Sequence, residues 1–131
     1  MEFSVDIQVR DSELDLYGVV NNAVYAQYFQ HARHEYLHTL GMDAALVAKQ
    51  GQAWALSELK LRFVTGLVSR DRARVTARVT QVSGVRVVFA QEIVRADGTL
   101  AAEAEAVAVM LNGQGRPMRI PPDVRRLLET P

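Results

Sequence analysis

The 131-residue sequence has no cysteine, a single tryptophan, no net charge and no long apolar run. Without cysteine the chain has no thiol nucleophile, disulfide framework or thiolate metal site, and this composition fits a reducing compartment. Fifteen basic and fifteen acidic side chains balance, which argues against a nucleic-acid footprint or a membrane-seeking surface. No stretch approaches about 18 apolar residues, and charges stand where a signal peptide would be apolar, so we expect a cytoplasmic protein.

Several catalytic motifs are also missing. The sequence contains no GxSxG elbow, P-loop or dinucleotide fingerprint. Their absence argues against a serine hydrolase, a P-loop NTPase and a Rossmann-type dinucleotide-binding protein. At this length, and with 49% of its residues hydrophobic, the chain is expected to form one soluble domain spanning residues 1–131.

The sequence does contain a clear succession of segments in which apolar residues recur with the spacing of a strand or of a helix. A half-buried strand is predicted for residues 3–10, and a helical period runs from Asn22 to Leu40, with Gly41 as its stop. A short helix is possible at 43–50. Alternation returns in four predicted strands, at 55–63, 72–80, 85–95 and 99–111. One long helix wrapped by an antiparallel β-sheet is an α+β architecture.

The alternation within the predicted strands also predicts which of their side chains face inward. In the strand at 55–63, the inward side is predicted to consist of Ala55, Ser57, Leu59, Leu61 and Phe63. In the last strand every second residue from Ala102 to Ala108 is alanine, which would let the helix lie close against it. The proline-rich tail after residue 111 is predicted to be extended before a short terminal turn of helix.

The segment from Asp15 to Tyr25, DLYGVVNNAVY, carries the most chemical information. It places an acid just before the predicted helix, where unpaired N–H groups and a partial charge of about half a unit can polarise a carbonyl. Gly18 can turn the chain, and Asn21 or Asn22 can cap the helix. These are the parts of an acyl-transfer site. From spacing alone, Asp15 as a simple turn former or N-cap remains the alternative.

The residues from Val9 to Leu37, VRDSELDLYGVVNNAVYAQYFQHARHEYL, resemble the opening of hotdog-fold thioesterases of the 4-hydroxybenzoyl-CoA thioesterase type. They are most similar to the plant acyl-lipid thioesterase and methylketone-synthase group, and SELKLRF from Ser57 and RPMRIPP from Arg116 extend the likeness. The resemblance implies a hotdog fold, a catalytic carboxylate at Asp15 and an oxyanion-facing N–H at Asn22. Thioester hydrolysis of this kind needs no metal or organic cofactor.

Arg33 is the third candidate for catalysis. Related enediyne-pathway thioesterases have Asn at the position of Asp15 and rely on an Arg that matches Arg33, whereas this sequence has both residues. Arg33 falls at the margin of the apolar helix stripe, so a structural ion pair with Glu58 or Glu103 is an equal alternative. Asp11 and Glu13 are read as loop residues.

The resemblance also implies a substrate and partners. The expected substrate is an acyl-CoA or acyl carrier protein thioester, with a fatty, 3-oxoacyl or aromatic acyl unit; the plant-like motif favours the first two. Family members resemble dimers or tetramers with sites at the interface, so a homo-oligomer is expected. Candidate substrate contacts are Gly18, Val19, Asn21, Tyr25 and Phe29, with Ser57 and Glu58 contributed by a second subunit. Tyr25 and Phe29 could instead be plain core.

Two other functions compete with hydrolysis. A non-catalytic acyl-CoA-binding module would use the same cleft. The residues HEYLH from His34 to His38 match the zinc-protease signature, but the extended pattern's final histidine is Ala44 here, and His31 is the only other histidine. All three histidines are predicted to be exposed on the polar face of the helix, which makes the protease a remote alternative.

Overall fold

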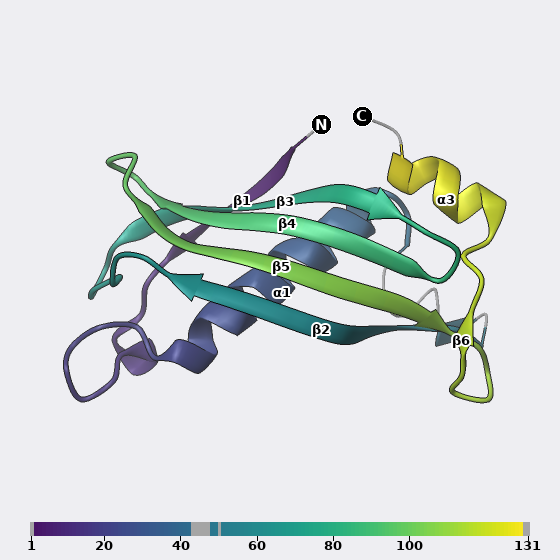
Figure 1. Ribbon diagram of the computed structural model, residues 1–131. Helices are drawn as coiled ribbons and strands as arrows, with labels where there is room; N and C mark the ends of the chain where they lie inside the picture. The colour runs from purple at the N-terminus through teal and green to yellow at the C-terminus, as the bar shows by residue number, and fades with distance from the viewer. Residues whose placement is uncertain (1, 43–47, 50, 130–131) are drawn as a thin grey trace.

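A long helix lies against one face of a curved antiparallel sheet in the computed structural model, which describes residues 2–42, 48–49 and 51–129 (Figure 1). The helix is α1 (Asn22–Thr39), a short 3-10 turn at Asp11–Glu13 precedes it, and α3 (Pro122–Glu129) closes the described chain. The strands are β1 (Phe3–Gln8), β2 (Ala53–Phe63), β3 (Arg72–Val82), β4 (Arg86–Arg95), β5 (Leu100–Leu111) and β6 (Pro117–Met118).

The strands are ordered β1-β3-β4-β5-β2, and the two-residue β6 pairs with β5. All pairings are antiparallel, as the short connections predicted. At the turn from β4 to β5, Gly98 has a φ of +91° and Asp97 Oδ1 accepts a 2.9 Å hydrogen bond from the Thr99 amide. In this order β1 and β2 are the outer strands of the sheet.

The core lies between α1 and the sheet. The helix buries the side chains that its period predicted, among them Tyr25, Tyr28, Phe29, Ala32 and Tyr36. Full burial of each large apolar side chain contributes about 1.5 to 3 kcal/mol before the entropy of ordering it is subtracted. The Tyr36 ring packs between Phe3 of β1 and Phe89 of β4, with centroid distances of 5.7 and 6.3 Å.

The α+β architecture, the long helix and the predicted strands are confirmed, with small shifts in their ends. Gly41, with a φ of +78°, follows the helix as expected. The short helix expected at 43–50 falls mostly outside the described residues. The terminal helix α3 is longer than the single turn that was predicted.

The predicted inward side of β2 is wrong in its first half. A bulge shifts the register between Leu56 and Glu58, so Ser57 is an extra residue in the strand. Trp54 and Leu56 pair with Met110 and Ala108, and they therefore share the inner face with Leu59 and Leu61. Ala55 pairs with Val109 and points the other way. A bulge changes the alternation that a strict period of two assumes.

The alanine stripe of β5 is buried, but α1 does not lie closest to it. Ala102, Ala104, Ala106 and Ala108 are each at most 8% exposed. The closest backbone approach of α1 is to β1 and β3 instead. Phe63, which pairs with Ala102, packs edge-on against Tyr25 of α1 at a centroid distance of 5.2 Å, so aromatic rings fill the space above the stripe.

None of the described helices is long and apolar enough to cross a bilayer.

Candidate active site

Asp15 lies in a tight turn immediately before α1. Its Oδ1 accepts hydrogen bonds from the amides of Tyr17 (2.8 Å) and Val19 (3.4 Å), and its own amide donates to the Val19 carbonyl at 2.8 Å. Among the described residues, Oδ2 has no hydrogen-bond or ionic partner. The turn-forming role and a catalytic role are therefore compatible, because each uses a different carboxylate oxygen.

Gly18 makes this turn possible. Its φ is +78°, in the left-handed region that favours glycine, and its amide donates to the Asp15 carbonyl at 3.2 Å. The loop tip that it terminates is fully in solvent, since Leu16 is 99% and Tyr17 89% exposed. Two large apolar side chains so exposed at the end of a turn are typical of a contact surface.

The start of α1 provides hydrogen-bond donors beside this turn. Asn21 is the N-cap, and its Oδ1 accepts a 2.9 Å hydrogen bond from the Ala23 amide, as the sequence predicted. The first helical amide, that of exposed Asn22, has no acceptor in the part of the chain that the structure describes. It remains free for an incoming carbonyl oxygen, and the helix dipole adds positive potential there.

Glu13 is a site feature that sequence reasoning missed. The residue is only 8% exposed, and its Oε1 accepts hydrogen bonds of 2.8 Å from the Tyr28 hydroxyl and from the Arg10 amide. Burial alone would raise the pKa of this carboxyl, but the hydrogen bonds from the Arg10 amide, Tyr28 and the Arg10 guanidinium outweigh it and lower the pKa. Arg10 is the N-cap of the 3-10 turn that contains Glu13, but Tyr28 lies 15 residues further on in α1, so no local pattern could reveal that contact.

Arg33 is buried, and its partner is not the carboxylate that was expected. The residue is 6% exposed, and Nη1 donates a 2.9 Å hydrogen bond to Gln91 Oε1 on β4. Among the described residues no carboxylate pairs with it, and Glu103 contacts Arg62 instead, at 3.4 Å. The structure therefore does not bring Arg33 to Asp15 within one subunit. Burial lowers the pKa of Arg33.

The remaining candidates divide between core and surface. Tyr25 (4% exposed) and Phe29 (0%) belong to the core, and the Tyr25 hydroxyl accepts a 3.1 Å hydrogen bond from the Leu67 amide. Val19 is half-buried and bridges to Val68, which fixes the turn against the segment after β2. Ser57 and Glu58 are exposed on the outer strand β2, where a second subunit could reach them.

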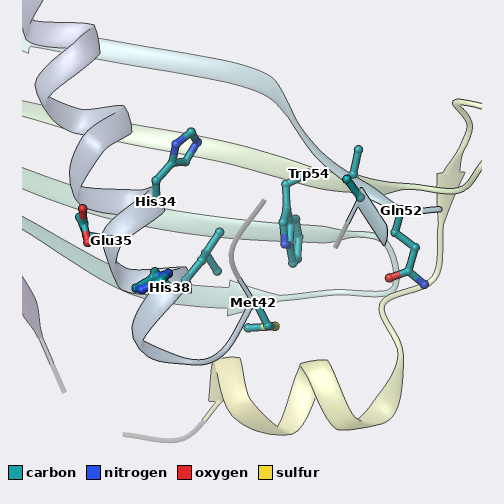
Figure 2. A pocket seen from close by; sticks show the side chains of 9 residues that line it. His34, Glu35, His38, Met42, Gln52 and Trp54 are labelled. Carbon is teal, nitrogen blue, oxygen red and sulfur yellow. The ribbon is translucent and has the colours of Figure 1, made fainter. Parts of the chain in front are cut away.

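The two histidines of the HEYLH segment, His34 and His38, lie in the half of α1 that is far from the Asp15 turn. Together with His31, the third histidine of the chain, they are exposed, as predicted. His34 and His38 line a pocket of about 400 Å³ between the C-terminal half of α1 and the start of β2, together with Met42 and Trp54 (Figure 2). Within the described residues, no three His, Asp or Glu side chains gather to hold a metal ion. The zinc-protease reading thus gains no support from the geometry.

The two ends of α1 are related through β2. Tyr25 in the first turn of α1 contacts Phe63 at the end of β2, and the last turns of α1 line a pocket together with Trp54 at the start of β2. Eighteen residues at 1.5 Å each separate these ends by about 27 Å. In a single subunit, the acid and the pocket are therefore far apart.

Comparisons with known proteins identify relatives of this chain. The chain is 44% identical over 122 residues to the acyl-acyl carrier protein thioesterase ATL3, chloroplastic, of Arabidopsis thaliana. This match covers 92% of the chain but only 64% of the plant protein. The acyl-CoA thioesterase YbgC of Haemophilus influenzae is 29% identical over 124 residues, which cover 94% of this chain and 91% of that protein.

Solved structures share the fold. The DHNA-CoA thioesterase from Staphylococcus aureus superposes with a TM-score of 0.90 at 25% sequence identity, over 96% of this chain and 87% of that one. The family model described as the Thioesterase-like superfamily matches residues 9–128, nearly the whole sequence. The fold is thus the hotdog fold that the sequence resemblance implied, and the chain belongs to the Thioesterase-like superfamily.

Proposed function

We propose that the protein hydrolyses an acyl thioester carried by coenzyme A or by acyl carrier protein. One observation carries the proposal: a carboxylate with a free oxygen stands in the turn before α1, whose first amide also lacks an acceptor among the described residues. Membership of the Thioesterase-like superfamily supports it. The active part of the site consists of Asp15 and the N–H of Asn22.

In the proposed reaction, the thioester oxygen accepts a hydrogen bond from the Asn22 amide, which stabilises the negative charge that develops on it. Asp15 either attacks the carbonyl carbon directly or takes a proton from a water that attacks it. The carbon–sulfur bond then breaks, and the sulfur leaves as a thiolate that is protonated. When water is the nucleophile, the acyl group is released directly as a carboxylic acid. When Asp15 is the nucleophile, the acyl group is left as an anhydride on its carboxylate, and water hydrolyses this anhydride to the acid and free Asp15. One water is consumed, and no redox partner is required.

The names of the relatives guide the choice of substrate. The plant relative is named for acyl carrier protein thioesters and the bacterial one for acyl-CoA. These names leave both carriers open. Because the motif from Val9 to Leu37 resembles the plant group, we propose fatty or 3-oxoacyl thioesters first and aromatic acyl-CoA second. A cytoplasmic location also stays a proposal, since the plant relative's name places that protein in the chloroplast.

We further propose that the active unit is a homo-oligomer built on the free edge of β2. The inner face beside this edge exposes apolar side chains, with Leu56 and Phe63 each 48% exposed. Antiparallel pairing of two β2 edges would set the end of one strand beside the start of the other. The Asp15 turn of one subunit would then face the Trp54 pocket of its partner, which could receive the acyl group.

The test is release of free thiol from a panel of aliphatic, 3-oxoacyl and aromatic acyl-CoA and acyl carrier protein thioesters. Asp15→Asn should lower kcat by about a hundredfold or more, because it removes the general base or nucleophile. Asp97→Asn is a matched control. Asp97 also accepts a hydrogen bond from the amide two residues ahead, at 2.9 Å, but lies in the turn between β4 and β5 and not before α1.

Unchanged turnover in Asp15→Asn would contradict the assignment of Asp15 and turn attention to Arg33. Tight retention of acyl-CoA by wild type, without thiol release from any substrate, would favour the non-catalytic binding module instead.

A further inference from the structure

Glu13 joins the turn that carries Asp15 to the middle of α1. The Tyr28 hydroxyl donates to Glu13 Oε1 at 2.8 Å, and the two residues are only 7% and 8% exposed. Burial and the neighbouring carboxylate raise the pKa of Tyr28, so its phenol stays protonated and remains a donor. Hydrogen bonds to an ionised acceptor are roughly twice as strong as those between neutral groups.

The backbone of Glu13 closes the base of the same loop. Its carbonyl accepts a 2.9 Å hydrogen bond from the amide of Asn21, the N-cap of α1. One residue further in, Leu14 and Val20 form an isolated bridge, and the Asp15 amide then bonds to the Val19 carbonyl. The loop is therefore a small hairpin whose base is Glu13 and whose tip is solvent. The only buried side-chain hydrogen bond from this hairpin to α1, among the described residues, is that of Glu13 to Tyr28.

Side-chain packing does little to hold the tip of the hairpin. The two tip residues after Asp15 are almost completely exposed. The position of the acid relative to the Asn22 amide thus depends on the hydrogen bonds at the hairpin base, together with the bridge from Val19 to Val68 and the 2.9 Å bond from the Val20 amide to the Leu67 carbonyl. A displacement of about 1 Å in a catalytic group can reduce a rate by roughly a hundredfold.

We propose that Glu13, held by Tyr28, is a positioning residue that fixes the Asp15 carboxylate relative to the first amide of α1. This inference rests on the proposed function, because it assigns Asp15 the catalytic role. Glu13 itself does not touch the substrate. It acts by restricting the hairpin, and Arg10 also holds it, through its backbone amide and its guanidinium group.

The chain offers a closely matched pair of variants for the test. Tyr28→Phe deletes the hydroxyl that bonds Glu13 and keeps the buried ring. Tyr36→Phe deletes the hydroxyl of another tyrosine on the same helix. Tyr36 is 8% exposed, and its hydroxyl has no hydrogen-bond partner among the described residues. Any loss from removing a buried tyrosine hydroxyl in general would appear in both variants.

We expect Tyr28→Phe to lower kcat for an acyl-CoA thioester by about tenfold, with KM within about twofold of wild type, since binding groups are untouched. Tyr36→Phe should leave both constants unchanged. Glu13→Gln keeps an acceptor for Tyr28 but loses the charge, so it should retain more activity than Glu13→Ala. Equal kcat in Tyr28→Phe and Tyr36→Phe would overturn the proposal.

Amide hydrogen exchange tests the same inference without relying on activity. Tyr28→Phe should speed exchange at residues 14–21 and leave the centre of the sheet unchanged, whereas Tyr36→Phe should not affect the hairpin. Unchanged protection of residues 14–21 would overturn the inference. If Tyr28→Phe loosens the hairpin while Asp15→Asn keeps full activity, the proposed role of Asp15 has failed and the structural role of Glu13 stands.

Discussion

The two carboxylates of the hairpin, at Glu13 and Asp15, differ in how their oxygens are used. Glu13 has both oxygens occupied, by Tyr28, the Arg10 amide and the Arg10 guanidinium. Asp15 has one oxygen in its turn and one without a partner in the described chain. A fully bonded, buried carboxylate suits a structural anchor, and a half-bonded, accessible one suits chemistry.

This difference gives the stability of the protein a pH dependence that can be assigned to Glu13. Its pKa in the folded protein is lowered from the ordinary value of 4.5. The ionised form therefore stabilises the fold fully above about pH 4.5, and that contribution is lost as pH falls through the lowered pKa. At pH 7 we expect Glu13→Gln to be less stable than wild type by about 1 kcal/mol, measured by urea unfolding.

Below pH 4.5 the difference between Glu13→Gln and wild type should shrink, because the wild-type carboxyl becomes neutral as well. A difference that stays constant between pH 7 and pH 3 would contradict the assignment.

At the scale of elements, Gln91 of β4 connects the helix to two strands. Its Oε1 accepts from Arg33 of α1, and its Nε2 donates to the carbonyls of Phe29 (3.0 Å) and Thr76 (3.1 Å). Gln91 is 2% exposed, so these groups have little access to water. The arrangement explains how a buried cation is accommodated without a carboxylate: the polar amide replaces part of its hydration.

Replacing Gln91 with leucine should therefore lower the free energy of unfolding by about 2 to 3 kcal/mol, because Arg33 and two carbonyls lose their partner. Gln81→Leu, at an exposed position of β3, is the matched control and should change stability by less than about 0.5 kcal/mol. Urea unfolding of both variants gives the comparison. Equal values for the two variants would show that the Gln91 network contributes nothing.

The elements themselves were predictable from sequence because their signals are local. The helical period from Asn22, the Asn21 cap and the alternation in β3 each depend on neighbouring residues, and the structure confirms them. The bulge at Ser57 was not predictable, since Ala55 and Ser57 are small enough to face either side. The partners of Arg33 and Glu13 lie 58 and 15 residues away, and no periodic pattern encodes such pairs.

The candidate site was predictable in part and for a different reason. Asp15, Gly18 and Asn22 are close in sequence, so a family motif contains all of them. Positions that a second subunit would contribute, such as Ser57 and Glu58, carry no local signal of their own. Their roles stay predictions.

At the scale of the whole molecule, the single chain leaves apolar surface uncovered at one end. Leu16, Tyr17, Phe63, Val64 and Val68 are between 43% and 99% exposed, and Val68 bridges to Val19 beside the Asp15 turn. The free edge of β2 ends in the same region. An unpaired strand edge and exposed apolar side chains together favour association with a second copy.

We expect wild type to elute in size-exclusion chromatography with light scattering at two or four times its mass of 14.6 kDa. The double variant Leu56→Lys with Phe63→Lys should elute near the monomer mass and lose thioesterase activity, because charges on both subunits would be opposed across the β2 edge. Leu127→Lys, at a 41% exposed position of α3, is the control and should keep the oligomer. A monomeric, fully active wild type would contradict the proposed assembly.

In the hairpin that carries Asp15, the carboxylate assigned to the reaction and the apolar side chains exposed to solvent belong to different residues. Tyr17 contributes only its backbone amide to the turn, and the Leu16 side chain is in solvent, so neither side chain takes part in holding the acid. Both residues can therefore mutate without moving Asp15. Substitutions at Leu16 and Tyr17 should therefore change what this exposed surface binds, a second copy of the chain included, while the backbone of the Asp15 turn keeps its geometry.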